Sequence, residues 1–165
     1  MTWFKNAAGR HGERGAKGDI GELFFVDAYR AKGWNVIHHG EDRSKQLAGI
    51  DVELVRPDGT MDSIDIKSNL KTDNSFAVEI DEKGWLFSPR KKSLFICHVN
   101  VDTKMLARYR RVAMQDYIRK GLNDGKLDVN KYYMNNLVWI KLDGKSDYVP
   151  NFISWGSAND IKENS

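Results

Sequence analysis

Residues 49–67 have the sequence GIDVELVRPDGTMDSIDIK. Apolar and polar residues alternate over 50–55 and again over 61–67, and Pro57, Asp58 and Gly59 lie between the two runs. Alternation with a period of two is typical of half-buried strands. An Asp-Gly pair between two such runs favours a tight turn. These residues therefore predict a β-hairpin.

The apolar residues of this hairpin predict which side chains share a face. A shift of one residue would turn a whole apolar set toward water, so one face is expected to carry Ile50, Val52, Leu54, Ile64 and Ile66. The opposite face then carries Asp51, Asp65 and Lys67. Two carboxylates and an ammonium group are therefore expected on one short patch.

The turn has to agree with this arrangement. A two-residue Asp58-Gly59 turn would pair Asp51 with Ile66 and direct their side chains to the same face, against the apolar pattern. We therefore expect a loop with an odd number of residues, such as 58–60, or a bulge, either of which would pair Asp51 with Lys67. Asp58 is then a turn residue and not a catalytic carboxylate.

The three polar groups fit a divalent-cation site that acts on a phosphate. Mg²⁺ takes oxygen ligands, keeps several waters and binds one or two carboxylates. A cation held by Asp51 and Asp65 would polarise a phosphoryl oxygen and activate water, and Lys67 would orient that water or neutralise the developing charge. The alternative is a solvated strand face with a cross-strand salt bridge worth about 0.2–1 kcal/mol. This alternative stays open because a D-x-K tripeptide alone is common.

A helix is predicted over 19–32, ending near Gly33, with an apolar face of Ile20, Leu23, Phe24, Ala28 and Ala31. Glu22 lies on a different side, among Gly18, Phe25, Val26 and Tyr29. A carboxylate on an apolar surface needs a partner, and Gly18 and Gly21 would allow a close approach. The alternative is an exposed glutamate that interacts favourably with the helix dipole.

Further strands are expected over 34–38, 76–80, 94–101 and 137–142, followed by a C-terminal tail that contains Trp155. A basic amphipathic helix is expected over 103–120. Its polar side would present Arg108, Arg111 and Arg119 to a DNA backbone, or would be a solvated basic face. A second basic cluster, at Arg90, Lys91 and Lys92, would be another DNA contact, in which Trp85 and Phe87 support a distorted duplex. The alternative is a tryptophan packed in the core.

The length of 165 residues, with 41% apolar and 30% charged residues, suits one domain over 1–165. Residues 1–17 are rich in glycine and basic side chains and are expected to form a flexible arm. Arg10, Arg14 and Lys17 would there contact phosphates, or the arm is simply a disordered terminus. The single cysteine excludes a disulfide within the chain. No signal peptide or membrane span is expected, which favours the cytoplasm.

Taken together, Glu22, Asp51 and the Asp65-Ile66-Lys67 tripeptide resemble the restriction-endonuclease-like, or PD-(D/E)xK, superfamily. This superfamily includes restriction enzymes, Holliday-junction resolvases, some homing endonucleases and phage exonucleases. The match spans roughly residues 17–100, and its departures are Ile50 in the place of the proline and Asp65 in the place more often held by glutamate.

The resemblance implies an α/β fold with a central mixed β-sheet flanked by α-helices. It also implies catalysis by Glu22, Asp51, Asp65 and Lys67, with Mg²⁺, or Mn²⁺ as a substitute, held by Asp51, Asp65 and Glu22. Gln46, and either Ser68 or Asn69, would touch the phosphate or a metal-bound water; the alternative for Gln46 is a simple loop residue.

The expected activity is that of an endodeoxyribonuclease with a junction-resolving or homing type of specificity. We expect a phage or mobile element to encode it, in which case the enzyme would act in the host cytoplasm. It is expected to be a homodimer, because one such site cuts one strand. No P-loop is present, so no nucleotide cofactor is expected. His38 and His39 are expected to be structural or surface residues. The alternative is a non-catalytic DNA-binding protein with a vestigial nuclease fold, and a hydrolase acting on RNA is a third hypothesis.

Overall fold

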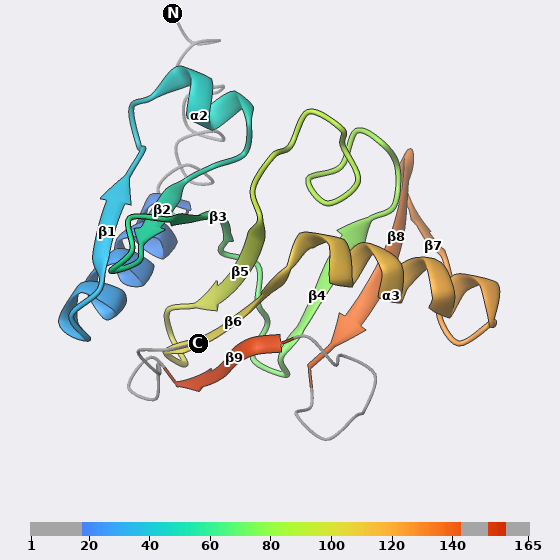
Figure 1. The fold of residues 1–165 in the computed structure, drawn as a ribbon. Helices are drawn as coiled ribbons and strands as arrows, with labels where there is room; N and C mark the ends of the chain where they lie inside the picture. Colours follow the sequence, from blue (N-terminus) through green and yellow to red (C-terminus); the bar gives the residue numbers. More distant parts are fainter. Residues whose placement is uncertain (1–17, 143–151, 158–165) are drawn as a thin grey trace, which may run out of the picture.

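In the part of the chain that the structure describes, the larger of two sheets has six strands in the order β1-β2-β3-β5-β6-β9 (Figure 1). The computed structural model describes residues 18–142 and 152–157. The strands are β1 (Asn35–His38), β2 (Val52–Val55), β3 (Met61–Lys67), β5 (Phe95–Asn100), β6 (Met105–Arg110) and β9 (Phe152–Ser157). The β3 and β5 strands are parallel and all the other pairs are antiparallel, so the sheet is mixed.

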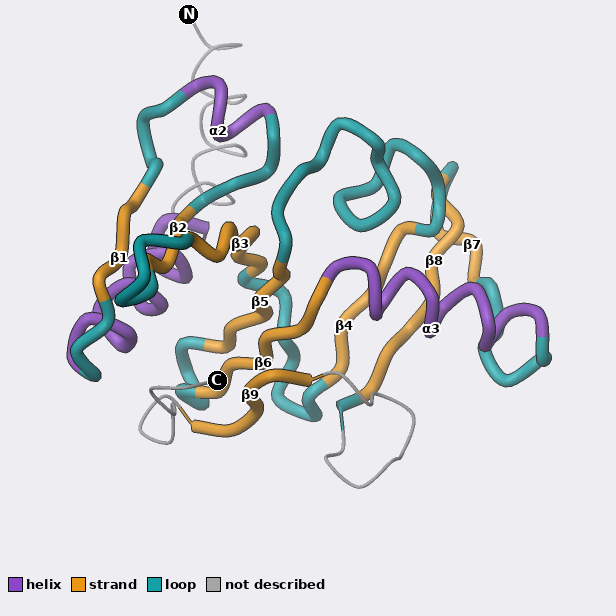
Figure 2. The backbone as a smooth tube through the Cα atoms, in the orientation of Figure 1, coloured by secondary structure: helices purple, strands orange, loops and turns teal. Residues whose placement is uncertain are grey.

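The second sheet has three antiparallel strands in the order β4-β8-β7. These are β4 (Ser75–Glu79), β7 (Asn130–Tyr132) and β8 (Asn135–Lys141). One helix covers residues 18–31, and the others are α2 (Arg43–Leu47) and α3 (Arg111–Asn123). Figure 2 shows the helix over 18–31 beside β1–β3 and α3 beside β4 and β8. The predicted mixed sheet flanked by helices is confirmed.

Two hydrophobic clusters lie on the two faces of the large sheet. The first joins the helix over 18–31 to one face of the sheet through Phe25, Val26, Tyr29, Val52, Leu54, Ile64 and Ile66. The second joins the other face to α3 and the small sheet through Phe76, Ile96, Tyr109, Met114, Ile118 and Val138. Because side chains alternate along a strand, Asp65 and Lys67 lie on the face of the second cluster.

The helix over 18–31 buries a different side from the one predicted. Ile20 and Leu23 are about half exposed, whereas Phe25 and Tyr29 are fully buried. Gly21 explains this orientation, because a Cβ at residue 21 would lie 1.8 Å from Oγ of Ser68. The absence of a side chain lets the helix lie directly against the end of β3. The apolar set that contains Phe25 and Tyr29 therefore forms the core contact.

The predicted basic helix over 103–120 is wrong in its first half. Residues 105–110 form β6, which pairs with β5, and α3 begins only at Arg111. Arg108 is fully buried, with its guanidinium 5.6 Å from the ring of Tyr29 and 5.2 Å from that of Phe95. Arg111 is also buried. Arg108 and Arg111 therefore do not lie on an exposed DNA-binding face.

The hairpin of residues 50–67 forms as predicted, with a different register. Its loop is residues 57–59, since the N–H of Arg56 donates to the carbonyl of Thr60 at 2.8 Å. Val52 is opposite Ile64, so continuing the register by one residue places Asp51 opposite Asp65. The odd loop is thus confirmed, while the predicted pairing of Asp51 with Lys67 is wrong by two residues. A shift of two leaves every side chain on its predicted face.

The remaining elements agree with the sequence in part. The strands expected over 34–38, 76–80, 94–101 and 137–142 occur within two residues of their predicted ends. The sequence patterns did not predict α2, β7 or β9, and the segment expected to be a tail with Trp155 contains β9. The predicted arm over 1–17 lies outside the described residues. Within the described part of the chain, no helix is long and apolar enough to cross a membrane.

Candidate active site

The candidate site lies where β1 and β3 end and β2 begins. Antiparallel pairing of β1 with β2 and of β2 with β3 brings these three strand ends to one edge of the sheet. Asp51 directly precedes β2, and Lys67 is the last residue of β3. The N–H of His39, just after β1, donates to the carbonyl of Asp51 at 2.8 Å. The backbone around Asp51 is therefore held by both neighbouring strands.

The side chain of Asp51 is fixed by a backbone hydrogen bond. Its Oδ2 accepts from the N–H of Ile66 at 2.7 Å. Burial raises the pKa of Asp51, and the negative charge of Glu22 raises it further, while the bond from Ile66 and the charge of Lys67 oppose the increase. Asp51 thus lies in a region where negative charge is concentrated and partly withdrawn from water.

Asp65 is the most deeply buried carboxylate of the site, with 2% of the residue exposed. Burial raises its pKa to about 6, and the nearby charge of Asp51 adds to this effect. Its Oδ1 lies 3.2 Å from Nζ of Lys67. Its Oδ2 is buried and has no hydrogen-bond partner in the described structure. A buried carboxylate oxygen without a hydrogen bond is costly.

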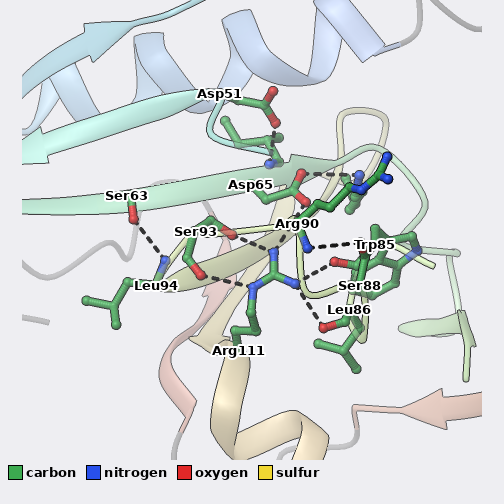
Figure 3. A network of polar contacts seen from close by, with 12 residues as sticks. Asp51, Ser63, Asp65, Trp85, Leu86, Ser88, Arg90, Ser93, Leu94 and Arg111 are labelled. Atoms are coloured by element: carbon green, nitrogen blue, oxygen red, sulfur yellow. Dashed lines mark hydrogen bonds and ion pairs between the residues drawn. The ribbon is translucent and has the colours of Figure 1, made fainter. Parts of the chain in front are cut away.

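Arg111 approaches Asp65 from the start of α3 (Figure 3). Its Nη2 lies 3.8 Å from Oδ2 of Asp65, an ion pair too long to be a hydrogen bond. The guanidinium donates to the carbonyls of Trp85, Leu86 and Ser93 at 2.5, 2.9 and 2.9 Å, and to Oγ of Ser93 at 2.7 Å. Burial lowers the pKa of Arg111. Arg111 thus ties the loop between β4 and β5 to the site.

Lys67 is partly covered by this loop. Its ammonium nitrogen lies 5.7 Å from the centre of the Trp85 ring, and 29% of its side chain is exposed. A cation over an indole face is attracted by the ring quadrupole. Asp65 and Trp85 together hold the ammonium group beside the carboxylates, and the side chain is exposed enough for a phosphate oxygen to reach it.

Glu22 comes to the site from the helix over 18–31, which covers the other face of the sheet. Its Oε2 lies 2.8 Å from Nε2 of His38, the last residue of β1. The negative charge of Glu22 raises the pKa of Asp51. The structure therefore brings Asp51, Asp65 and Lys67 together, and the carboxylate of Glu22 is near enough for its charge to act on Asp51.

Two glycines allow the backbone to approach the site closely. A Cβ at Gly49 would lie 2.7 Å from Cδ of Lys91 and 3.6 Å from Oδ2 of Asp65, and its φ is +68°. A Cβ at Gly21 would collide with Ser68. Of the two glycines suggested by the sequence, Gly21 makes the close contact, whereas an added Cβ at Gly18 would meet nothing within 4 Å.

The other predicted contact residues are more scattered. Nε2 of Gln46 donates to the carbonyl of Gly40 at 2.6 Å, so Gln46 caps a local loop. Nδ1 of His98 donates to Oδ1 of Asn69 at 2.6 Å. Arg119 is exposed on α3, with its guanidinium 5.2 Å from the Phe87 ring. Arg10, Arg14 and Lys17 lie outside the described residues.

Arg90, Lys91 and Lys92, the basic loop, precede β5 and lie close to the carboxylates. The N–H of Lys92 donates to the carbonyl of Ala48 at 2.8 Å, which attaches this loop to the segment before Asp51. Arg90 and Lys92 are exposed, while the stem of Lys91 packs against Gly49. A cationic surface thus lies directly beside the acidic patch.

The donor set fits a cation that prefers oxygen. Over residues 18–142 there is no group of three or more His, Cys, Asp or Glu side chains that could enclose a metal. A cation that takes two carboxylates and several waters does not need one. Oδ2 of Asp65 accepts no hydrogen bond in the described structure, and burial raises the pKa of Asp51 and of Asp65, so the charges of Lys67 and Arg111 offset the burial of these carboxylates only in part. Asp51 and Asp65 are therefore the residues that could hold such an ion, with Glu22 beside them.

The fold is similar to that of a bacterial homing endonuclease. This structure, I-Ssp6803I, matches with a TM-score of 0.49 and 12% identity over 82% of this chain and 83% of that chain. A nuclease from a fusellovirus matches with a TM-score of 0.34 and 17% identity over 73% of this chain and 76% of that chain. No family model and no curated protein matches the sequence. At these identities and TM-scores, neither match assigns an activity to this chain.

Sequence reasoning missed three residues of the site: His38, Trp85 and Arg111. Arg111 was expected on an exposed helix face, and His38 was expected to have only a structural or surface role. His38 contacts Glu22, Trp85 contacts Lys67 and Arg111 contacts Asp65. Each of these contacts joins segments that are distant in the sequence. Local patterns carry no information on such contacts.

Proposed function

We propose that this chain is a Mg²⁺-dependent endonuclease that hydrolyses phosphodiester bonds of DNA. One observation carries the proposal: Asp65 is a buried carboxylate beside Asp51, its Oδ2 accepts no hydrogen bond in the described structure, and its Oδ1 lies 3.2 Å from the ammonium group of Lys67. A cross-strand salt bridge on a solvated face would not bury a carboxylate in this way. The arrangement suits a site that binds a cation and an anionic substrate together.

Each residue has a role that follows from its position. Asp51 and Asp65 would hold Mg²⁺, which when bound supplies a Lewis acid that polarises the phosphoryl oxygen and makes water more acidic. Lys67 neutralises negative charge that develops on the phosphate, from an ammonium position already fixed by Asp65 and Trp85. Arg111 keeps the loop that carries Trp85 closed over Asp65.

The positive charge of the basic loop favours a polyanionic substrate. Its exposed side chains are next to the acidic patch, where they can contact phosphates on either side of the cleaved bond. Such contacts fix position and carry no base specificity. Two copies of the chain would cut both strands of a duplex, which is why we propose a homodimer.

The test is incubation with Mg²⁺ or Mn²⁺ against linear, supercoiled, single-stranded and four-way-junction DNA, with RNA in parallel. We expect DNA cleavage that stops when EDTA is added. Asp51→Asn and Lys67→Ala should abolish cleavage and leave the fold and much of the DNA affinity intact. Asp58→Asn is the matched control, because Asp58 is an exposed acid in the turn of the same hairpin.

The outcomes separate the competing functions. Cleavage retained by Asp51→Asn would overturn the site. DNA binding without cleavage of any substrate, and without binding of a divalent metal, would favour the non-catalytic DNA-binding protein. Cleavage of RNA alone would favour the RNA hydrolase.

A further inference from the structure

Two adjacent histidines at the end of β1 each contact a glutamate. Nε2 of His38 lies 2.8 Å from Oε2 of Glu22, and Nε2 of His39 lies 2.7 Å from Oε1 of Glu53. Successive side chains of a strand point to opposite faces, so the two pairs lie on different sides of the sheet. An ionised carboxylate only accepts hydrogen bonds, so each histidine donates from Nε2.

The two pairs differ in their surroundings. Glu53 is also bound by Lys45, whose Nζ lies 3.0 Å from Oε1, so its charge is compensated locally. For Glu22, the described part of the chain shows the contact with His38 and no lysine or arginine within ion-pair distance. The charge of Glu22 acts on Asp51. The side chain of His38 therefore contacts a carboxylate whose charge acts on the candidate site, whereas the side chain of His39 contacts a glutamate that Lys45 already compensates.

The imidazole of His38 is itself fixed. Gly40 follows two residues later, and a Cβ there would lie 3.2 Å from Cε1 and 3.4 Å from Nε2 of the ring. The backbone of Gly40 thus lies against the imidazole. His38 and Glu22 are only partly exposed, with 29% and 19% of their side chains accessible. A long glutamate side chain that begins on the other face of the sheet is therefore held by a ring with little freedom.

We propose that His38 is a positioning residue that holds the carboxylate of Glu22 beside Asp51, and so completes the acidic site. This rests on the proposed function, because the role of the site is to bind a divalent cation and a phosphate. Without His38, Glu22 would have several rotamers available and would turn toward water. Groups that orient metal-binding side chains typically change affinity or activity by about 10–100-fold when removed.

The experiment compares His38→Ala, His38→Gln and His39→Gln in the full chain. Glutamine retains an N–H donor at about the reach of Nε2, so it should restore the bond to Glu22. His39→Gln is the matched control for changing an adjacent His–Glu pair of the same length. Mn²⁺ affinity is measured by calorimetry, single-turnover cleavage at saturating DNA is measured at one pH, and thermal unfolding is followed by circular dichroism.

We expect His38→Ala to weaken Mn²⁺ binding and slow single-turnover cleavage by about 10-fold or more, with the affinity for DNA in EDTA unchanged. His38→Gln should recover most of both losses, and His39→Gln should stay within about threefold of the wild type. Unchanged Mn²⁺ affinity and cleavage in His38→Ala, or equal losses in His39→Gln, would overturn the inference.

The failure of the proposed function looks different. If the wild type binds Mn²⁺ but cuts no nucleic acid, the endonuclease proposal falls and the Mn²⁺ affinities still decide the role of His38. If the wild type binds no Mn²⁺, both proposals fall. If the wild type cuts DNA and the His38 variants behave like it, only the inference falls.

Discussion

Asp65→Asn tests whether the buried carboxylate reduces the stability of the fold. The pKa of Asp65 is raised from 3.8 to about 6, chiefly by burial. The folded protein therefore binds more protons than the unfolded chain between these values, and stability falls as the pH rises through this range. The difference of about 2.2 in pKa corresponds to about 3 kcal/mol at pH 7.

Asparagine has nearly the same shape and cannot ionise. We therefore expect Asp65→Asn to remove a penalty of about 3 kcal/mol at pH 7, but less than about 1 kcal/mol at pH 4, where the carboxyl is neutral in the folded protein. The advantage of the variant over the wild type should grow between these two pH values. Cleavage should be lost at the same time, because asparagine carries no charge to hold a cation.

The assay is urea unfolding of both proteins at intervals from pH 4 to pH 8, in EDTA so that no metal stabilises the wild type. The quantity compared is the difference in the free energy of unfolding at each pH, which cancels the titration of most other groups. A difference that does not change with pH would show that Asp65 titrates normally, and would refute the argument from burial.

Three further results are expected. Arg111→Met should reduce the free energy of unfolding by about 3–5 kcal/mol. Arg111→Lys should not restore this free energy, because lysine lacks the planar guanidinium fork. A lysine variant as stable as the wild type in urea unfolding would contradict this. Gly21→Ala should cost about 1–3 kcal/mol through overcrowding, and thermal unfolding should show partial recovery when Ser68→Gly is added; equal stability of Gly21→Ala and wild type would disprove the close contact. Replacing all three residues of the basic loop by alanine should make the slope of log affinity for DNA against log salt shallower by up to about 3, and an unchanged slope in a salt titration would exclude this loop from the interface.

The apolar pattern of the hairpin was sufficient to predict the shared face of Asp51, Asp65 and Lys67. It could not predict the register, because a shift of two residues leaves each side chain on the same face. The loop begins one residue earlier than expected, at Pro57, and this places Asp51 opposite Asp65. The apolar residues of a strand pair thus determine which face each side chain occupies, while the register depends on the turn.

Residues 105–110 show where local patterns fail. Their apolar side chains satisfy a helical period, yet pairing with β5 makes them a strand. In the folded chain the guanidinium of Arg108 lies near the ring of Phe95 in β5 and near the ring of Tyr29, which belongs to a distant segment. The burial of Arg108 and Arg111 depends on these long-range contacts, so charge alone wrongly suggested a surface role for both residues.

The strands of the small sheet alternate in the sequence with those of the large sheet, since β4 lies between β3 and β5, and β7 and β8 lie between β6 and β9. The pairing of β4 with β8 joins residues 58 to 66 positions apart, whereas the hairpin of Asp51 and Asp65 joins residues 6 to 12 positions apart. Local contacts form quickly during folding and distant ones slowly. The acidic hairpin is therefore expected to form while its carboxylates are still hydrated, and to lose water only when α3 and the second sheet close over it.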